Sequence, residues 1–140
     1  MYKIKNFEFS KDSSSNTDII DITNDIFKKV QEAEVQNGSV LIYIQGSTAS
    51  LTTIEYESGV LDDFKKALER LVPENMVYKH DLKWGDGNGY SHIRSSLLGP
   101  SVTIPIVSGE LMVGTWQQIV LLDFDNRPRK RKIIVQVSGI

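Results

Sequence analysis

Hydrophobic and polar positions along the chain follow two different periods. A period of two, in which side chains point alternately to opposite faces, is typical of strands. This period, or a short β-branched apolar run, predicts strands over residues 2–9, 40–44, 51–56, 102–107, 111–114, 116–124 and 132–137. Ser108-Gly109 separates two of these segments and predicts a hairpin. The C-terminal part of the chain is therefore expected to be an antiparallel run of strands.

Two longer segments have the helical period instead. Thr17 or Asp18 is the expected cap of the first helix, whose apolar residues recur at helical spacing until Val30. Ser58 is the expected cap of the second helix, and Pro73 ends it because proline cannot continue a helix.

The order of these elements predicts an α+β fold in a single domain over residues 1–140. We expect a mainly antiparallel sheet with two longer helices and one short helix. The short helix is predicted over residues 90–98, before Gly99-Pro100. Residues 73–89 form the longest segment without a clear period. A loop of this length in a compact domain usually carries function.

Composition narrows the class of protein. With 40% hydrophobic and 24% charged residues, the chain has the balance of a globular domain. A net charge of −2 gives no general attraction to nucleic acid or to an anionic membrane. The absence of cysteine excludes disulfides and thiolate metal sites. No apolar run approaches the roughly 18 residues of a membrane span, and no signal peptide is evident, so we expect a cytoplasmic protein.

A basic run over residues 127–132 could attract phosphate or nucleic acid. Strand alternation, however, places Arg129 and Arg131 on one face and the intervening lysines on the other. This division argues against nucleic-acid binding and favours a solvated strand. Arg127 and Arg129 remain candidates for recruiting a phosphate group.

The two histidines of the chain, His80 and His92, bracket the end of the irregular segment. Asp81, Asp86 and Asn88 lie between them, and the glycines at 85, 87 and 89 allow the chain to fold back. Two histidines and a carboxylate suit zinc, manganese or ferrous iron. The glycines could equally form a nest of N–H groups that binds an anion, or a turn without ligands. The glycine spacing matches neither a dinucleotide fingerprint, a Walker loop nor an EF-hand.

Two further groups of residues are candidates for a site. Ser47 and Thr48 belong to a run of small polar residues between two predicted strands, where hydroxyls could bind phosphate or water, although a plain hairpin explains them as well. Glu55 could act there as a general base. Gln117 could face a cleft, whereas its neighbour Trp116 is expected in the core.

Several segments in this order resemble the YjbQ family, also called UPF0047. The resemblance runs from about residue 40 to the C-terminus. It is carried by GSTA (46–49), TIE (53–55), LVP (71–73), YKH (78–80), GDGNGYSH (85–92), SLLGPS (96–101), GTWQQ (114–118) and DFD (123–125).

The resemblance implies an α+β fold and a homotrimer with sites close to subunit boundaries. It also implies that His80 and His92 are ligands of a divalent metal, zinc or magnesium/manganese, with Asp86 and Asn88 nearby. Two positions depart from the family pattern. The loop at residues 45–48 lacks a histidine that many members have, and Tyr90 stands where some relatives have histidine. Both departures leave fewer metal ligands in this chain.

Two functions follow as hypotheses. In the first, the protein is an enzyme of the secondary thiamine-phosphate synthase type, acting on a phosphorylated small molecule at the His80/His92 metal or anion site. Glu55 and Asp86 would then be the catalytic acid or base. The expected substrate-binding residues are Ser47, Thr48, Asn88, Gln117 and Arg127. In the second, the protein is a non-catalytic oligomeric module that binds a phosphorylated metabolite.

Overall fold

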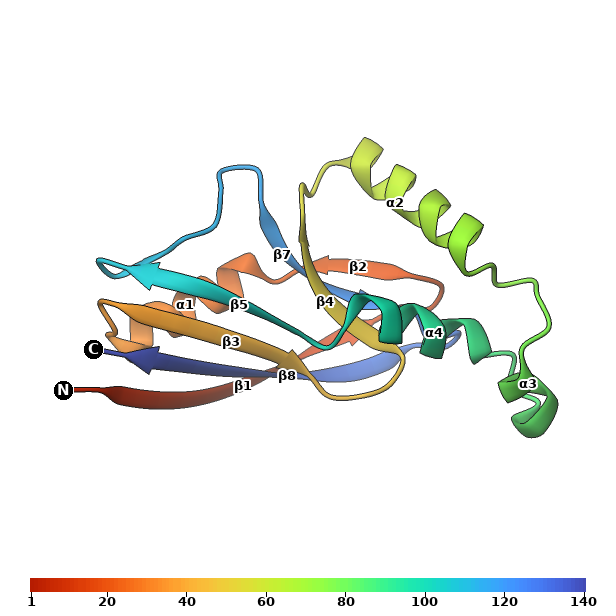
Figure 1. Ribbon diagram of the computed structural model, residues 1–140, viewed down its shortest axis with the longest axis horizontal. Coiled ribbons are helices and arrows are strands. Elements are labelled where there is room, and N and C mark those ends of the chain that lie inside the picture. Colours follow the sequence, from red (N-terminus) through yellow and green to blue (C-terminus); the bar gives the residue numbers. More distant parts are fainter.

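Two antiparallel sheets share one hydrophobic core in the computed structural model, which describes residues 1–140 (Figure 1). The larger sheet has the order β1 (Lys3–Ser13), β8 (Arg129–Gly139), β3 (Gly38–Ile44), β5 (Ser101–Val107) and β6 (Glu110–Leu111). The smaller sheet has the order β2 (Asp18–Asp21), β7 (Gln118–Asp123) and β4 (Ala49–Ile54). The helices are α1 (Thr23–Ala33), α2 (Ser58–Leu71), α3 (Lys79–Trp84) and α4 (Gly89–Leu98). The predicted α+β class and antiparallel pairing are confirmed.

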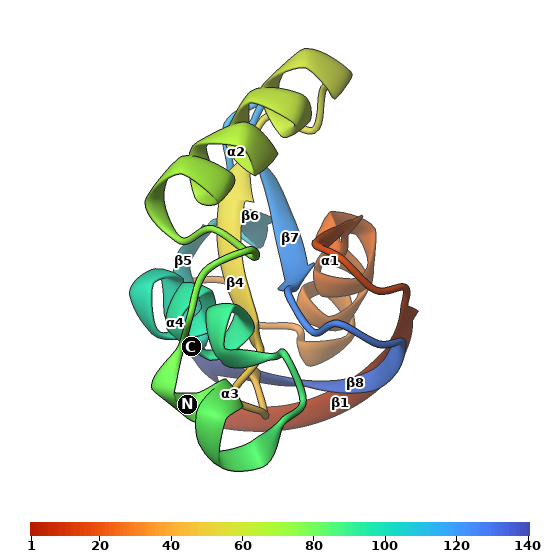
Figure 2. The same cartoon turned by 90° about the vertical axis from the view of Figure 1, so that its right-hand side faces the viewer.

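The main core lies between the larger sheet, α1 and one face of the smaller sheet. Alternation along β3 shows how the sequence directs side chains into it, since Val40 and Ile42 are fully buried whereas Leu41 and Tyr43 are exposed. The helix α2 lies over the other face of the smaller sheet (Figure 2). Its Leu68 packs into a second cluster there. The middle strand β7 is therefore covered on both faces, which explains its continuous apolar run.

The predicted start of the first helix is wrong. The segment from Asp18 forms β2, which pairs with β7, and α1 begins only at Thr23. Ile19 and Ile22 have helical spacing, but Ile19 pairs with Leu122 across the smaller sheet. Long-range pairing thus overrides the local period. The Asp21 carboxylate accepts hydrogen bonds from the backbone N–H and the hydroxyl of Thr23, at 2.9 and 2.6 Å.

Two other helix predictions need correction. The cap of α2 is Glu57, not Ser58, because the Glu57 carboxylate accepts the N–H groups of Gly59 and Val60. The hydrogen bond from Gly59 is the main reason that the pKa of Glu57 lies below its usual value. The helix α3 lies within the segment predicted as a loop, and none of its residues is buried. It has no apolar stripe from which it could have been predicted.

No helix of the structure has the length and apolar character needed to cross a membrane.

Candidate functional site

The two histidines lie on neighbouring helices, His80 on α3 and His92 on α4. The chain reverses direction between them through Gly85 and Gly87, whose φ angles of +66° and +65° favour glycine. The reversal brings the two imidazole rings together, with centroids 4.5 Å apart and planes tilted by 43°. The loop therefore folds back as the glycines predict.

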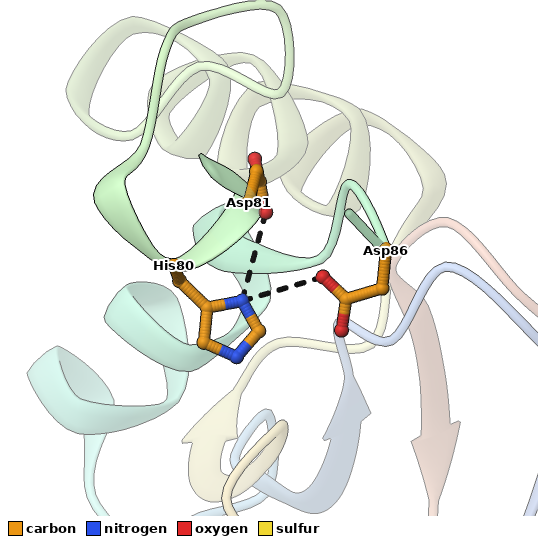
Figure 3. A group of neighbouring side chains, drawn as sticks. All are labelled: His80, Asp81 and Asp86. Carbon is orange, nitrogen blue, oxygen red and sulfur yellow. Dashed lines mark ion pairs between the residues drawn. The ribbon is translucent and has the colours of Figure 1, made fainter. Parts of the chain in front are cut away.

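Two carboxylates approach the Nδ1 atom of His80 (Figure 3). The Oδ1 atom of Asp86 lies 3.3 Å away and the Oδ1 atom of Asp81 lies 3.6 Å away. The Nδ1 atom is buried and makes no hydrogen bond. Ligands placed around a tetrahedral zinc ion at its usual bond lengths are separated by about 3.4 Å. Both the chemistry and the spacing of this group of donors therefore fit a divalent cation.

The loop that carries Asp86 is held from several sides. The N–H of Gly89 donates to the Oδ1 atom of Asp81 at 2.8 Å, and the N–H of Asn88 donates to the Oδ1 atom of Asp86 at 3.2 Å. The Asn126 side chain, from the turn between β7 and β8, donates to the backbone carbonyl of Asp86 at 2.8 Å. Asn88 is itself buried, and its Oδ1 atom accepts the N–H of Asn126 at 3.1 Å. Two N–H groups of the predicted anion nest are thus occupied by the chain's own carboxylates.

A cleft of about 260 Å³ lies beside His92. Tyr43, Gly46, Ser47 and Ser96 contribute to its walls together with His92. The structure therefore brings Ser47 and His92, both expected at the site, to one cleft. The helix α4 is fixed against β4 here by hydrogen bonds from Ser95 and Ser50 to backbone carbonyls.

Thr48 is turned away from the cleft into a network of buried charges. Its hydroxyl donates a hydrogen bond to the Oδ2 atom of Asp125 at 3.0 Å and accepts one from the Nη2 atom of Arg131 at 2.6 Å. Arg131 also forms a bidentate pair with Asp123, through Nε at 2.7 Å and Nη2 at 2.8 Å. The strand faces alternate as predicted, but Arg131 is buried, which corrects the expectation of a wholly solvated strand.

The pKa of Asp125 lies below its usual value. Burial acts to raise it, but hydrogen bonds from Thr48 and Arg129 and the charge of Arg129 together outweigh burial. The network is therefore built to keep this carboxylate ionised.

The remaining predicted residues lie elsewhere in the chain. Glu55 lines a separate cleft with Trp116, and Gln117 donates to the Thr53 hydroxyl at 3.1 Å. Arg127 is exposed in the turn between β7 and β8. Trp116 is 74% exposed, so its expected place in the core is wrong: it belongs to the turn that precedes β7.

Sequence reasoning left two residues of this region without a role. Asp81 is next to His80 in the sequence, but only the first turn of α3 brings its carboxylate back to the His80 ring. Arg131 could have been singled out by strand alternation, which aligns it with Arg129. Its carboxylate partner Asp123 lies at the end of β7, on the other side of the turn.

Comparison with known proteins gives a consistent result along the whole chain. Residues 6–140 match the family described as UPF0047 protein YjbQ-like. A UPF0047 protein of Archaeoglobus fulgidus is 40% identical over 129 residues, which cover 92% of this chain and 98% of the relative. The UPF0047 protein YugU of Bacillus subtilis is 32% identical over 128 residues, which cover 91% of this chain and 94% of the relative.

Solved structures agree with this result. A YbjQ-like protein of unknown function from Sulfolobus solfataricus superposes with a TM-score of 0.95 at 27% identity, covering 100% of both chains. An uncharacterised conserved protein of the yjbq/upf0047 family from Clostridium acetobutylicum gives a TM-score of 0.85 at 35% identity, covering 94% of this chain and 98% of the other.

Proposed function

The chain belongs to the UPF0047 family of YjbQ-like proteins, and we propose that it is a small-molecule enzyme whose site is built around His80 and His92. The observation that carries the proposal is the buried Nδ1 atom of His80, which has no hydrogen-bond partner beside two carboxylates. A buried polar atom without a partner is costly, and such atoms are rare unless another group completes the arrangement. A divalent metal ion is the group that these donors suit.

The ligands that we propose are His80, Asp81 and Asp86, whose donor atoms all lie within 4.8 Å of one another. The His92 ring lies beside that of His80, with centroids 4.5 Å apart, but it is not a member of this group. A histidine ligand favours zinc or manganese over magnesium, which prefers oxygen atoms and water. Such an ion, when bound, supplies a Lewis acid that polarises a carbonyl or phosphoryl oxygen.

The side chains of the cleft would then bind and orient the substrate. His92 and Tyr43 are the ionisable side chains among the residues that line it. We propose His92 as the group that exchanges a proton with the substrate, because its imidazole lines the cleft and has one nitrogen that can donate a hydrogen bond and one that can accept one. Asp86 is in this proposal a metal ligand rather than a free acid or base. Glu55 lies in a different cleft of the same chain, so a catalytic role for it would require a neighbouring subunit.

The test is to measure metal in protein that is purified without a histidine tag. We expect about one equivalent of zinc or manganese in the wild type, and its loss in His80→Ala, since the nitrogen ligand is then gone. Asp62→Asn is the matched control, because Asp62 is an exposed carboxylate that pairs with Lys66 on α2. Equal metal content in wild type and His80→Ala would contradict the metal site.

The reaction implied by the family resemblance joins a pyrimidine pyrophosphate to a thiazole phosphate and releases pyrophosphate. The same proteins are assayed with this substrate pair, and we expect product with wild type and Asp62→Asn but not with His80→Ala. Binding without turnover would instead support the non-catalytic module. That alternative is favoured by one observation: within a single chain, neither Glu55 nor Gln117 reaches the cleft beside His92.

We also propose that the protein associates with itself, as the resemblance to homotrimers implies. Leu41 and Tyr43 on β3 and Ile93 and Leu97 on α4 are large apolar side chains between 37% and 67% exposed. Tyr43 lines the cleft as well, so an interface over these side chains would lie at the margin of the site.

A further inference from the structure

The loop between β3 and β4 has unused hydrogen-bond donors. The backbone N–H groups of Gly46, Ser47 and Thr48 donate to no acceptor within the chain. Gly46 has a φ of +121°, a conformation that favours glycine. Consecutive unpaired N–H groups are the donors from which anion-binding loops are built. The donors of this loop are therefore free. In the glycine loop at residues 85–89, by contrast, two N–H groups already donate to carboxylates of the chain.

A nearly buried guanidinium lies against the same loop. The Arg131 side chain is 9% exposed, and its Nε and Nη2 atoms bond to Asp123 and Thr48. Its Nη1 atom makes no hydrogen bond and is not sealed from solvent. A Cβ atom added to Gly46 would lie 3.0 Å from this Nη1. Glycine at position 46 thus leaves room beside the one free nitrogen of a fixed positive group.

We propose that the N–H groups of residues 46–48, the Ser47 hydroxyl and Nη1 of Arg131 bind a phosphoryl group of the substrate. Gly46 and Ser47 line the same cleft as His92, so the group would be bound at the loop end of that cleft. The inference rests on the proposed function, whose substrate it defines as a phosphate ester or pyrophosphate. Several converging N–H donors and a guanidinium suit a tetrahedral oxyanion. Because Asp123 already neutralises Arg131, we expect weak binding of free phosphate, with the rest of the substrate adding affinity.

The experiment is calorimetric titration of inorganic phosphate into chelator-treated protein at constant ionic strength. We expect saturable binding to the wild type, since the loop itself supplies the donors. Ser47→Glu should weaken it about tenfold or more, because a fixed carboxylate would occupy the same donors and repel the anion. Ser58→Glu, which adds the same charge to the exposed first turn of α2, should leave binding unchanged.

A second variant tests the contribution of Arg131 without removing it from the buried network. Gly46→Ala places a methyl group against Nη1, and we expect phosphate binding to fall several-fold while thermal unfolding still shows a folded protein. Absence of saturable binding to the wild type would overturn the inference. So would equal affinity in Ser47→Glu, or binding that requires added metal. Phosphate binding that persists in His80→Ala would support the loop even if the metal site failed its own test.

Discussion

At the scale of single residues, Tyr90 is a polar group with no evident partner. Its side chain is 3% exposed, and its hydroxyl makes no hydrogen bond. The Arg94 guanidinium lies 5.0 Å from the centre of its ring, which favours the aromatic face but leaves the hydroxyl unpaired. Burial, with the nearby charge of Glu74, raises the pKa of Tyr90 to about 12. The ring is therefore useful for packing, whereas its hydroxyl is a cost to the folded state.

Tyr90→Phe is expected to be neutral or to stabilise the protein by up to about 1–2 kcal/mol at pH 7, because it removes a buried hydroxyl without a partner. The pH dependence should change as well. Because the pKa of Tyr90 is higher in the folded than in the unfolded protein, deprotonation favours the unfolded state. The free energy of unfolding is therefore unaffected below the unfolded pKa, near 10, and falls as the pH rises toward 12. Urea unfolding at pH 7 and pH 11 should show a smaller alkaline loss in the variant. Tyr2→Phe, at an exposed ring, should alter neither value; a large loss of stability at pH 7 in Tyr90→Phe would reveal a hidden partner of the hydroxyl.

At the scale of elements, the turn between β7 and β8 is hydrogen-bonded to the glycine loop at residues 85–89. The Asn126 side chain donates to the Asp86 carbonyl, and its N–H donates to Asn88. These contacts set where the Asp86 carboxylate lies relative to His80. A residue that never touches the proposed ion can thus control the geometry of its ligands.

Asn126→Ala should lower metal affinity about tenfold, because the backbone of Asp86 loses a hydrogen bond at 2.8 Å while His80 and Asp81 remain. Competition with a chelating dye measures the change directly. Asn24→Ala removes an exposed asparagine on α1 that makes no hydrogen bond through its side chain, and it should leave the affinity at the wild-type value. Equal affinity in both variants would mean that the turn does not position the ligand.

Local signals explain which elements could be predicted from the sequence. The helix α4 was predictable because Gly99-Pro100 ends it, and the hairpin between β5 and β6 because of Ser108-Gly109. The strand β2 was not, since its pairing with β7 joins residues about a hundred positions apart. Nor was α3, whose residues are all at least partly exposed.

The same division applies to the site. The proximity of His80, His92 and Asp86 follows from glycines within a short loop, so the sequence alone indicates it. The place of Glu55 depends on how the two sheets pack, which no local pattern contains. The burial of Arg131 depends on its pairing with Asp123 in another strand.

At the scale of the whole molecule, one side of the protein remains without a partner. The larger sheet packs one face against α1 and the smaller sheet (Figure 1). Leu41 and Tyr43 alternate with the buried residues of β3 and are exposed on the other face. Ile93 and Leu97 lie four residues apart and share an exposed face of α4. Large apolar side chains left exposed in this way favour association, and the proposed homotrimer would bury them.

Leu97→Glu is expected to convert the proposed homotrimer into a monomer, because a charge within the proposed apolar contact would be buried without a counter-ion. Light scattering coupled to size-exclusion chromatography gives the mass of each species. Leu71→Glu is the matched control, since Leu71 is a leucine on another helix, α2, that is 76% exposed against 67% for Leu97, and its variant should keep the wild-type mass. If Leu97→Glu keeps the wild-type mass, the contact lies elsewhere. If the variant becomes monomeric and also loses activity while it still binds metal, the site depends on a neighbouring subunit, which would give Glu55 a route into the chemistry.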